Sequence, residues 1–199
     1  MSYREPYAGY WRSGSRRMGL TQMSASSPDN NRIVGFAPVA TIDAHTLILG
    51  SMPGEDSLRL AQYYANPRNA FWKIISRHAD RENDLTYERR LKMLSDHGIA
   101  LWDVLHSCQR SGSLDSSIRN ASVVTNDFAG FFTSHPGIRR IFFNGAFAEA
   151  SYRKHVLPTL DTLQANIPMT RVPSTSPANA SLGFEAKLQA WRAIFEQCP

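Results

Sequence analysis

The sequence is short of cysteine, of long apolar runs and of common nucleotide-binding and hydrolase motifs. Its two cysteines, Cys108 and Cys198, imply no disulfide framework and cannot supply the four thiolates of an iron–sulfur cluster. No apolar run approaches the roughly eighteen residues that span a bilayer, and the start has no apolar signal-peptide core. We therefore expect a cytoplasmic protein without membrane contact. The histidines show no ligand spacing, so we expect no metal, and nothing in the sequence implies a cofactor.

The positive charge is concentrated at the start of the chain. The net charge is +5, and residues 1–32, with five Arg and two acidic residues, account for +3 of it. This segment is rich in Ser, Arg and Gly and lacks apolar periodicity, which predicts a disordered or loosely docked basic arm. Residues 33–199 then form one domain, long enough to enclose a sizeable core. A basic chain favours a nucleic-acid partner, but the predicted domain is close to neutral.

From residue 33 onward, strand-like runs alternate with helical patterns. Buried strands are predicted at 46–49, 99–104, 138–143 and 169–172, and an edge strand, interrupted by Pro38, at 33–41. Helices are predicted at 57–65, 70–79, 86–97, 127–134, 146–155 and 184–197, with Asp56 or Ser57 capping the first and Asn69 the second. This alternation predicts an α/β fold: a three-layer α/β/α sandwich with a central four-stranded, mainly parallel sheet.

Two polar, Gly- or Pro-containing segments each follow a predicted strand. They are Gly50-Ser51-Met52-Pro53-Gly54 and Pro173-Ser174-Thr175-Ser176-Pro177. Parallel strands end at one edge of a sheet, where α/β folds bind ligands, so we expect both segments to line one site. Neither segment is a nucleophile elbow or a P-loop. A third segment, Tyr63-Tyr64-Ala65-Asn66-Pro67-Arg68-Asn69-Ala70-Phe71-Trp72, places two amides and a cation before two aromatic residues.

These segments resemble motifs 1 and 2 of the uracil-DNA glycosylase superfamily, and over residues 33–197 they are most similar to its hypoxanthine-DNA (deoxyinosine) glycosylase branch. The resemblance implies the strand order 2-1-3-4. It also implies a DNA repair enzyme that flips out a deaminated base, hypoxanthine or also uracil, and hydrolyses its N-glycosidic bond. The expected partner is DNA containing a deaminated base, bound by a monomer. The matched motifs contain no Lys that could form a Schiff base, so no strand-cleaving lyase activity is expected.

The resemblance also assigns the catalytic residue. Most relatives carry Asn or Asp in motif 1 to position water, but this chain has Met52, whose thioether cannot do so. The hypoxanthine branch has the same loss and is expected to use the Asn of its Arg-Asn-Ala-Phe-Trp segment, here Asn69. An amide cannot act as a strong base, but it can orient water by hydrogen bonding while preorganised donors stabilise the departing base.

The remaining site residues fall into two groups. Ser51, Met52, Tyr64 and Asn144 are predicted to bind the base, Tyr64 by stacking and Asn144 through its amide edge. The residues predicted to contact DNA are Ser174, Thr175 and Ser176, which would hold phosphates, and Leu182, which would insert into the duplex.

Other interpretations remain open at this point. Tyr64 and Leu182 could be packing residues, Asn69 a helix cap and Asn144 part of a turn at a strand end. The alternative acids Asp56, Asp103 and Asp115 are each expected to cap a helix or pair with Arg. For the whole chain, the alternatives are a uracil- or mismatch-specific glycosylase, a catalytically inert nucleic-acid-binding module, and a small-molecule hydrolase built on the same sheet.

Overall fold

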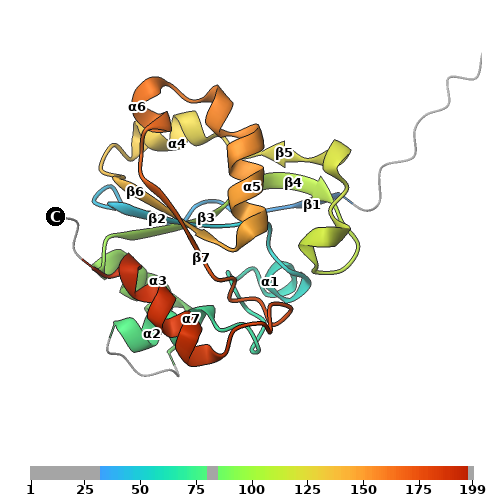
Figure 1. The fold of residues 1–199 in the computed structure, drawn as a ribbon, viewed down its shortest axis with the longest axis vertical. Coiled ribbons are helices and arrows are strands. Elements are labelled where there is room, and N and C mark those ends of the chain that lie inside the picture. Colours follow the sequence, from blue (N-terminus) through green and yellow to red (C-terminus); the bar gives the residue numbers. More distant parts are fainter. Residues whose placement is uncertain (1–31, 80–84, 197–199) are drawn as a thin grey trace, which may run out of the picture. The chain divides into compact units, whose positions relative to one another are not determined.

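A four-stranded parallel sheet lies at the centre of the molecule (Figure 1), whose computed structural model describes residues 32–79 and 85–196. Its strands are β2 (Thr46–Gly50), β3 (Ile99–Asp103), β6 (Arg140–Asn144) and β7 (Met169–Val172), arranged in the order β3-β2-β6-β7. All three pairings are parallel. The four predicted strands are confirmed. Numbered by their sequence along the chain, β2, β3, β6 and β7 are strands 1, 2, 3 and 4, so the predicted order 2-1-3-4 is also confirmed.

Helices cover both faces of this sheet, which confirms the three-layer α/β/α fold (Figure 1). On one face, Leu47 and Leu49 belong to a core that includes aromatic residues of α4 (Phe128–Ser134) and α5 (Ala146–His155). On the other face, Ile48 belongs to a core built with α2 (Phe71–His78), α3 (Tyr87–Asp96) and α7 (Phe184–Trp191). Successive strand residues point to opposite faces, so the uninterrupted apolar run of β2 serves both cores.

A second, antiparallel sheet of three strands was not predicted. It consists of β1 (Arg32–Val34), β4 (Leu105–Gln109) and β5 (Val124–Thr125), in the order β1-β4-β5. The predicted edge strand over 33–41 is therefore wrong in length: only its first residues form a strand, and they pair with β4. Pro38 cannot donate to a ladder, and beyond it Val39 makes only an isolated bridge to Leu101.

The predicted helix over 57–65 begins earlier and ends earlier than expected. Helix α1 spans Glu55–Leu60, and Ala61 then adopts a left-handed conformation with φ of 51°. Gly54 stands at its N-cap, so neither Asp56 nor Ser57 caps it, and the Ser57 hydroxyl instead accepts a hydrogen bond from the Ala65 backbone N–H. The helix predicted over 184–197 is α7 followed by the 3₁₀ turn Arg192–Ile194. The remaining short elements are α6 (Thr162–Ala165) and the 3₁₀ turns Asp115–Ser117, Asn120–Ser122 and Leu157–Thr159.

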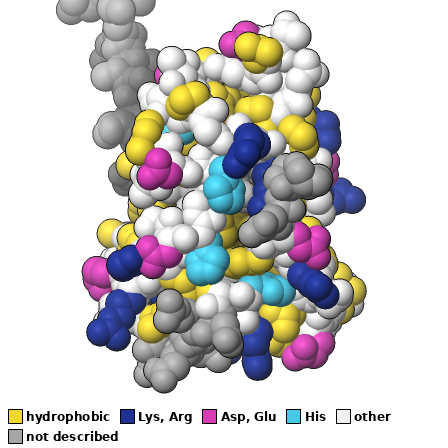
Figure 2. Space-filling view, turned by 90° about the vertical axis from the view of Figure 1, so that its left-hand side faces the viewer, with side chains coloured by type: hydrophobic (Ala, Val, Ile, Leu, Met, Phe, Trp, Pro, Cys, Tyr) yellow, Lys and Arg dark blue, Asp and Glu magenta, His cyan; other side chains and the backbone are white. Residues whose placement is uncertain are grey.

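The face at the left of Figure 1, drawn in Figure 2, mixes Lys and Arg with Asp, Glu and His. A hollow at the amino ends of β2, β3 and β6 has the same mixed character, because Arg139 and Arg140 lie there with Asp43, Asp96 and Glu196. Acidic and basic side chains in one hollow create no strong field of a single sign. In the described ranges, no helix is long and apolar enough to cross a membrane.

Removal of residues 1–31 is expected to leave folding and the chemical step unchanged. The predicted arm lies outside the described residues except for Arg32, which begins β1 and donates to the Ser107 hydroxyl at 2.8 Å. The truncation therefore keeps β1 intact, and we expect only weaker DNA binding at low salt, because Arg residues neutralise phosphates. Thermal unfolding, salt-dependent DNA binding and single-turnover rates of both chains would check this. Unfolding or loss of chemistry on truncation would contradict it.

Candidate active site

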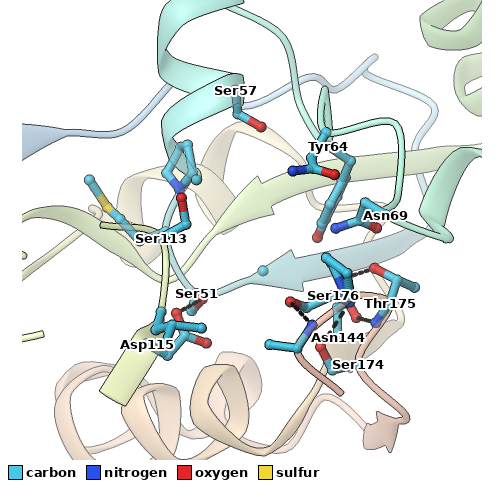
Figure 3. Close-up of a pocket in the computed structure, with 18 of the residues that line it drawn as sticks. Ser51, Ser57, Tyr64, Asn69, Ser113, Asp115, Asn144, Ser174, Thr175 and Ser176 are labelled. Atoms are coloured by element: carbon cyan, nitrogen blue, oxygen red, sulfur yellow. Dashed lines mark hydrogen bonds between the residues drawn. The ribbon is translucent and has the colours of Figure 1, made fainter. Parts of the chain in front are cut away.

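A cavity of about 840 Å³ opens at the carboxyl ends of the central strands (Figure 3). Its wall combines residues after β2, the 63–69 segment, the end of β3 with the 113–116 turn, and the end of β6 with the loop after β7. The two polar segments predicted to share one site do line this cavity. Its volume is in the range of small-ligand sites and suits a single nucleotide base with its sugar.

The first polar segment lines the cavity and also holds neighbouring segments in place through hydrogen bonds. The Ser51 hydroxyl donates to Asp115 at 2.7 Å, which holds the 113–116 turn against the end of β2. The Met52 side chain is buried in the apolar core, with 6% of its surface exposed. The carbonyl of Pro53 accepts a hydrogen bond from the guanidinium of buried Arg110, which also donates to the Gly112 carbonyl at 2.8 Å. Met52 therefore has neither the chemistry nor the position to hold water through its side chain.

Asn69 lines the cavity and directly precedes Ala70, the N-cap residue of α2. Its side-chain oxygen accepts a hydrogen bond from the Phe71 backbone N–H at 3.0 Å, at the start of α2. This bond fixes which end of the amide is oxygen. The Nδ2 group makes no hydrogen bond to any described residue, so its two N–H donors remain for a ligand or a water. The predicted cap is displaced by one residue, because the N-cap of α2 is Ala70. The bond to the Phe71 N–H and the catalytic prediction are nevertheless compatible in the one Asn69 side chain.

Tyr64 extends into the cavity beside Asn69 (Figure 3). Its backbone is left-handed, with φ of 53°, and its ring stacks on Phe71 at a centroid separation of 3.9 Å. The buried hydroxyl makes no hydrogen bond of standard geometry to the described residues. Burial raises the pKa of Tyr64 above its ordinary value, as does the nearby Asp103, whereas the Asn144 amide opposes the rise. The phenol is therefore neutral at physiological pH and keeps a proton to donate.

Asn144 ends β6 and joins the second polar segment to the sheet. Its Nδ2 donates to the Thr175 hydroxyl and its Oδ1 accepts from the Thr175 backbone N–H, both at 2.9 Å. The Thr175 carbonyl accepts in turn from the Ala70 N–H at 3.0 Å, which ties the loop to the start of α2. Asn144 therefore keeps one N–H and one lone pair for a ligand.

The residues predicted to contact DNA are not equally accessible. Thr175 is 1% exposed, and its hydroxyl is bound to Asn144. Ser174 and Ser176 line the cavity, and their hydroxyls accept hydrogen bonds from backbone N–H groups two residues later. Leu182 is 41% exposed and does not line the cavity. Ser174 and Ser176 thus retain donors toward the cavity, whereas Thr175 serves the loop itself.

Two of the alternative acids, Asp103 and Asp115, lie in the cavity wall, a position that was not predicted from the sequence. Asp103 is 4% exposed, caps no helix, and its Oδ2 has no hydrogen-bond partner in the described structure. Burial, reinforced by Asp115 and opposed by Arg110, raises the pKa of Asp103 to about 7. Burial also raises the pKa of Asp115, against the effects of Ser51 and Arg110. Asp56 instead pairs with Arg59 at 3.0 Å near the rim. The one local sign in the sequence that Asp103 would be buried was its position directly after the apolar run Ile-Ala-Leu-Trp.

Comparison with known proteins defines the class of protein. Residues 37–195 match the family described as the Uracil DNA glycosylase superfamily, and the chain belongs to this superfamily. Among the described residues, no group of acidic, His or Cys side chains could hold a metal ion.

Particular members of the superfamily are similar to this chain. A Methanosarcina acetivorans protein named Hypoxanthine DNA glycosylase is 38% identical over 163 residues, covering 81% of this chain and 96% of that protein. A Methanosarcina barkeri protein of the same name is 35% identical over 112 residues, covering 56% of this chain and 70% of its own length. A solution NMR structure from M. acetivorans, described as a candidate uracil DNA glycosylase, matches with a TM-score of 0.66 at 32% identity, covering 83% of this chain and 99% of that one.

Proposed function

We propose that this protein is a monofunctional DNA repair glycosylase that works as a monomer and hydrolyses the N-glycosidic bond of a deaminated base, hypoxanthine in preference to uracil. The observation that carries the proposal is one cavity in which Ser51, Tyr64, Asn69 and Asn144 meet from separate segments. Relatives named Hypoxanthine DNA glycosylase support the choice of base.

The cavity residues suit an extruded base better than a duplex. A base inside the helix cannot reach this depth, so the damaged nucleotide must rotate out of the stack. The Tyr64 ring, backed by Phe71, offers an aromatic surface to the base, and the free N–H of Asn144 offers a donor to its edge. Ser174 and Ser176 would position phosphates, and Leu182 would fill the gap left in the duplex.

Asn69 is the group that would orient the attacking water. Glycosidic cleavage passes through an oxocarbenium-like transition state, so the nucleophile needs positioning more than strong activation. The Asn69 Nδ2 donors are free, and the Phe71 N–H bond to Oδ1 holds the amide in place. No Lys lines the cavity within the described structure, which supports water and not an amine as the nucleophile.

Base release from defined duplexes tests the proposal. Duplexes containing one inosine, uracil, xanthine or only normal bases would be incubated with the protein and then treated with alkali to cleave abasic sites. We expect cleavage of the inosine duplex first, and strand cleavage without alkali to be absent. Release of no base from any duplex would favour the inert binding module. Hydrolysis of free nucleosides alone would favour the small-molecule hydrolase.

Substitution of Asn144 by alanine is expected to change base preference and to lower stability. The Thr175 N–H and hydroxyl would lose their partners, at a cost of about 1–3 kcal/mol, which corresponds to a fall in melting temperature of about 2–4 °C per kcal/mol in a domain of this size. Thr175→Val is the matched control, because it loses the hydroxyl but leaves Asn144 in place. Release ratios for inosine, uracil and xanthine would be compared in both variants. An unchanged ratio in Asn144→Ala would remove its role in base reading.

A further inference from the structure

Two unpartnered polar groups converge on the floor of the cavity. Asp103 and Gly50 are paired across β2 and β3, and both line the cavity. A Cβ atom built on Gly50 would lie 2.3 Å from Asp103 Oδ1 and 2.9 Å from the Tyr64 hydroxyl oxygen. Neither the Asp103 carboxyl nor the Tyr64 hydroxyl makes a standard hydrogen bond to a described residue. A buried polar group without a partner is costly, so this arrangement indicates a partner supplied by a ligand.

The surroundings of Asp103 favour its neutral form. Among the described residues, the charged groups that act on it are Asp115, from the 115–117 turn, and Arg110, which directly follows β4. Two of the Arg110 nitrogens donate to backbone carbonyls, of Pro53 and Gly112, so the guanidinium is not paired with Asp103. Tyr63 and Tyr64 also face this carboxyl, and burial keeps both phenols neutral. Asp103 therefore holds its proton below a pH of about 7 and loses it above.

Besides Asp103, the buried acid of this cavity is Asp115, and the Ser51 hydroxyl and Arg110 both favour its ionised form. Asn69 and Asn144 do not titrate in water, Met52 is buried, and the phenol of Tyr64 is a weak acid. A carboxyl that titrates near neutral pH is well matched to general acid catalysis at that pH.

We infer that Asp103 is a catalytic residue, the general acid that protonates the departing purine. This inference rests on the proposed glycosylase function. As the bond between C1′ and N9 breaks, its electron pair passes to the base, and the proton of Asp103 passes to a purine ring nitrogen. Water held by Asn69 adds to C1′ and releases its surplus proton to solvent, and Asp103 recovers a proton from solvent once the base has left.

The dependence of the reaction on pH tests this role. Single-turnover release from an inosine duplex would be measured between about pH 5 and pH 9 for the wild type, Asp103→Asn and Asp115→Asn. In the wild type, the rate is expected to fall as pH rises through about 7, approaching a tenfold loss per pH unit. Asp103→Asn keeps the shape of the side chain but has no proton to give, so it should be about 100-fold slower at low pH and should lack this decline.

Asp115→Asn supplies an independent readout. The charge of Asp115 helps to raise the pKa of Asp103, so its removal should move the decline in rate to lower pH. Circular dichroism and DNA affinity, both expected to be unchanged in Asp103→Asn, separate chemistry from folding and binding. A wild-type rate or pH profile in Asp103→Asn, or an unmoved decline in Asp115→Asn, would overturn the assignment while leaving the glycosylase function intact. A wild type that releases no base from any duplex would overturn both.

Discussion

Replacement of Asn69 by alanine is expected to slow base release about 100-fold or more, because it removes an amide of the cavity wall whose two N–H donors are free to hold the attacking water. Met52 cannot take over this role, because its thioether is buried in the core. The measurement is the single-turnover rate on the duplex that the wild type cleaves best. A near-normal rate would move the role to another residue, with Asp103 and Asp56 the next candidates.

The same substitution also removes a hydrogen bond at the start of α2, and the two effects must be separated. Loss of the bond from Asn69 Oδ1 to the Phe71 N–H should cost about 1 kcal/mol of folding stability. Asn69→Ser is the matched control, because a serine hydroxyl can accept the same bond from the Phe71 N–H but cannot reproduce the amide. We expect Asn69→Ser to recover the melting temperature and to remain slow. If Asn69→Ser also recovers the rate, the alanine variant is slow because the start of α2 is disturbed, and not because the amide is missing.

Substitution of Gly50 by alanine is expected to reduce base release about 100-fold, because the new methyl group would occupy the space over the cavity floor. It would lie 2.3 Å from Asp103 Oδ1 and 2.9 Å from the Tyr64 oxygen, so these groups must shift. A displacement of about 1 Å near reacting atoms can cost a factor of about 100. Overpacking should also destabilise the fold by about 1–3 kcal/mol.

Gly183→Ala is the matched control for this substitution. Gly183 lies outside the cavity, at the N-cap of α7, and a Cβ atom there meets nothing within 4 Å. Rates at saturating protein and melting temperatures of both variants would be compared, so that loss of chemistry is distinguished from loss of fold. A Gly50→Ala variant with wild-type kinetics would mean that neither Asp103 nor Tyr64 contacts the base at this point.

Three of the four central strands could be predicted because buried parallel strands are continuous apolar runs: β2 and β3 are buried at every residue, and β6 at its three central residues. The fourth, β7, has two exposed residues and was predicted from a shorter run. The antiparallel sheet could not, because β4 reads Leu-His-Ser-Cys-Gln without clear alternation. That strand depends on pairing with residues 32–34, far away in the chain, which no local pattern specifies. The early end of α1 has the same kind of cause, since Ala61 turns left-handed to bring the following segment into the cavity wall.

By itself, the sequence determined which residue types follow the central strands, and therefore that Ser51, Asn144 and Ser174 would meet at one edge of a parallel sheet, whereas the place of Asn69 in the site was an expectation from the resemblance. Only the tertiary structure decided which of their polar groups remain free for a ligand. Asn144 and Thr175 bind each other, the Asn69 oxygen accepts from the Phe71 N–H, and the Asp103 carboxyl is left without a hydrogen-bond partner among the described residues. The physical reason is that hydrogen-bond satisfaction and pKa depend on burial and on neighbours distant in the chain, which local sequence patterns do not encode.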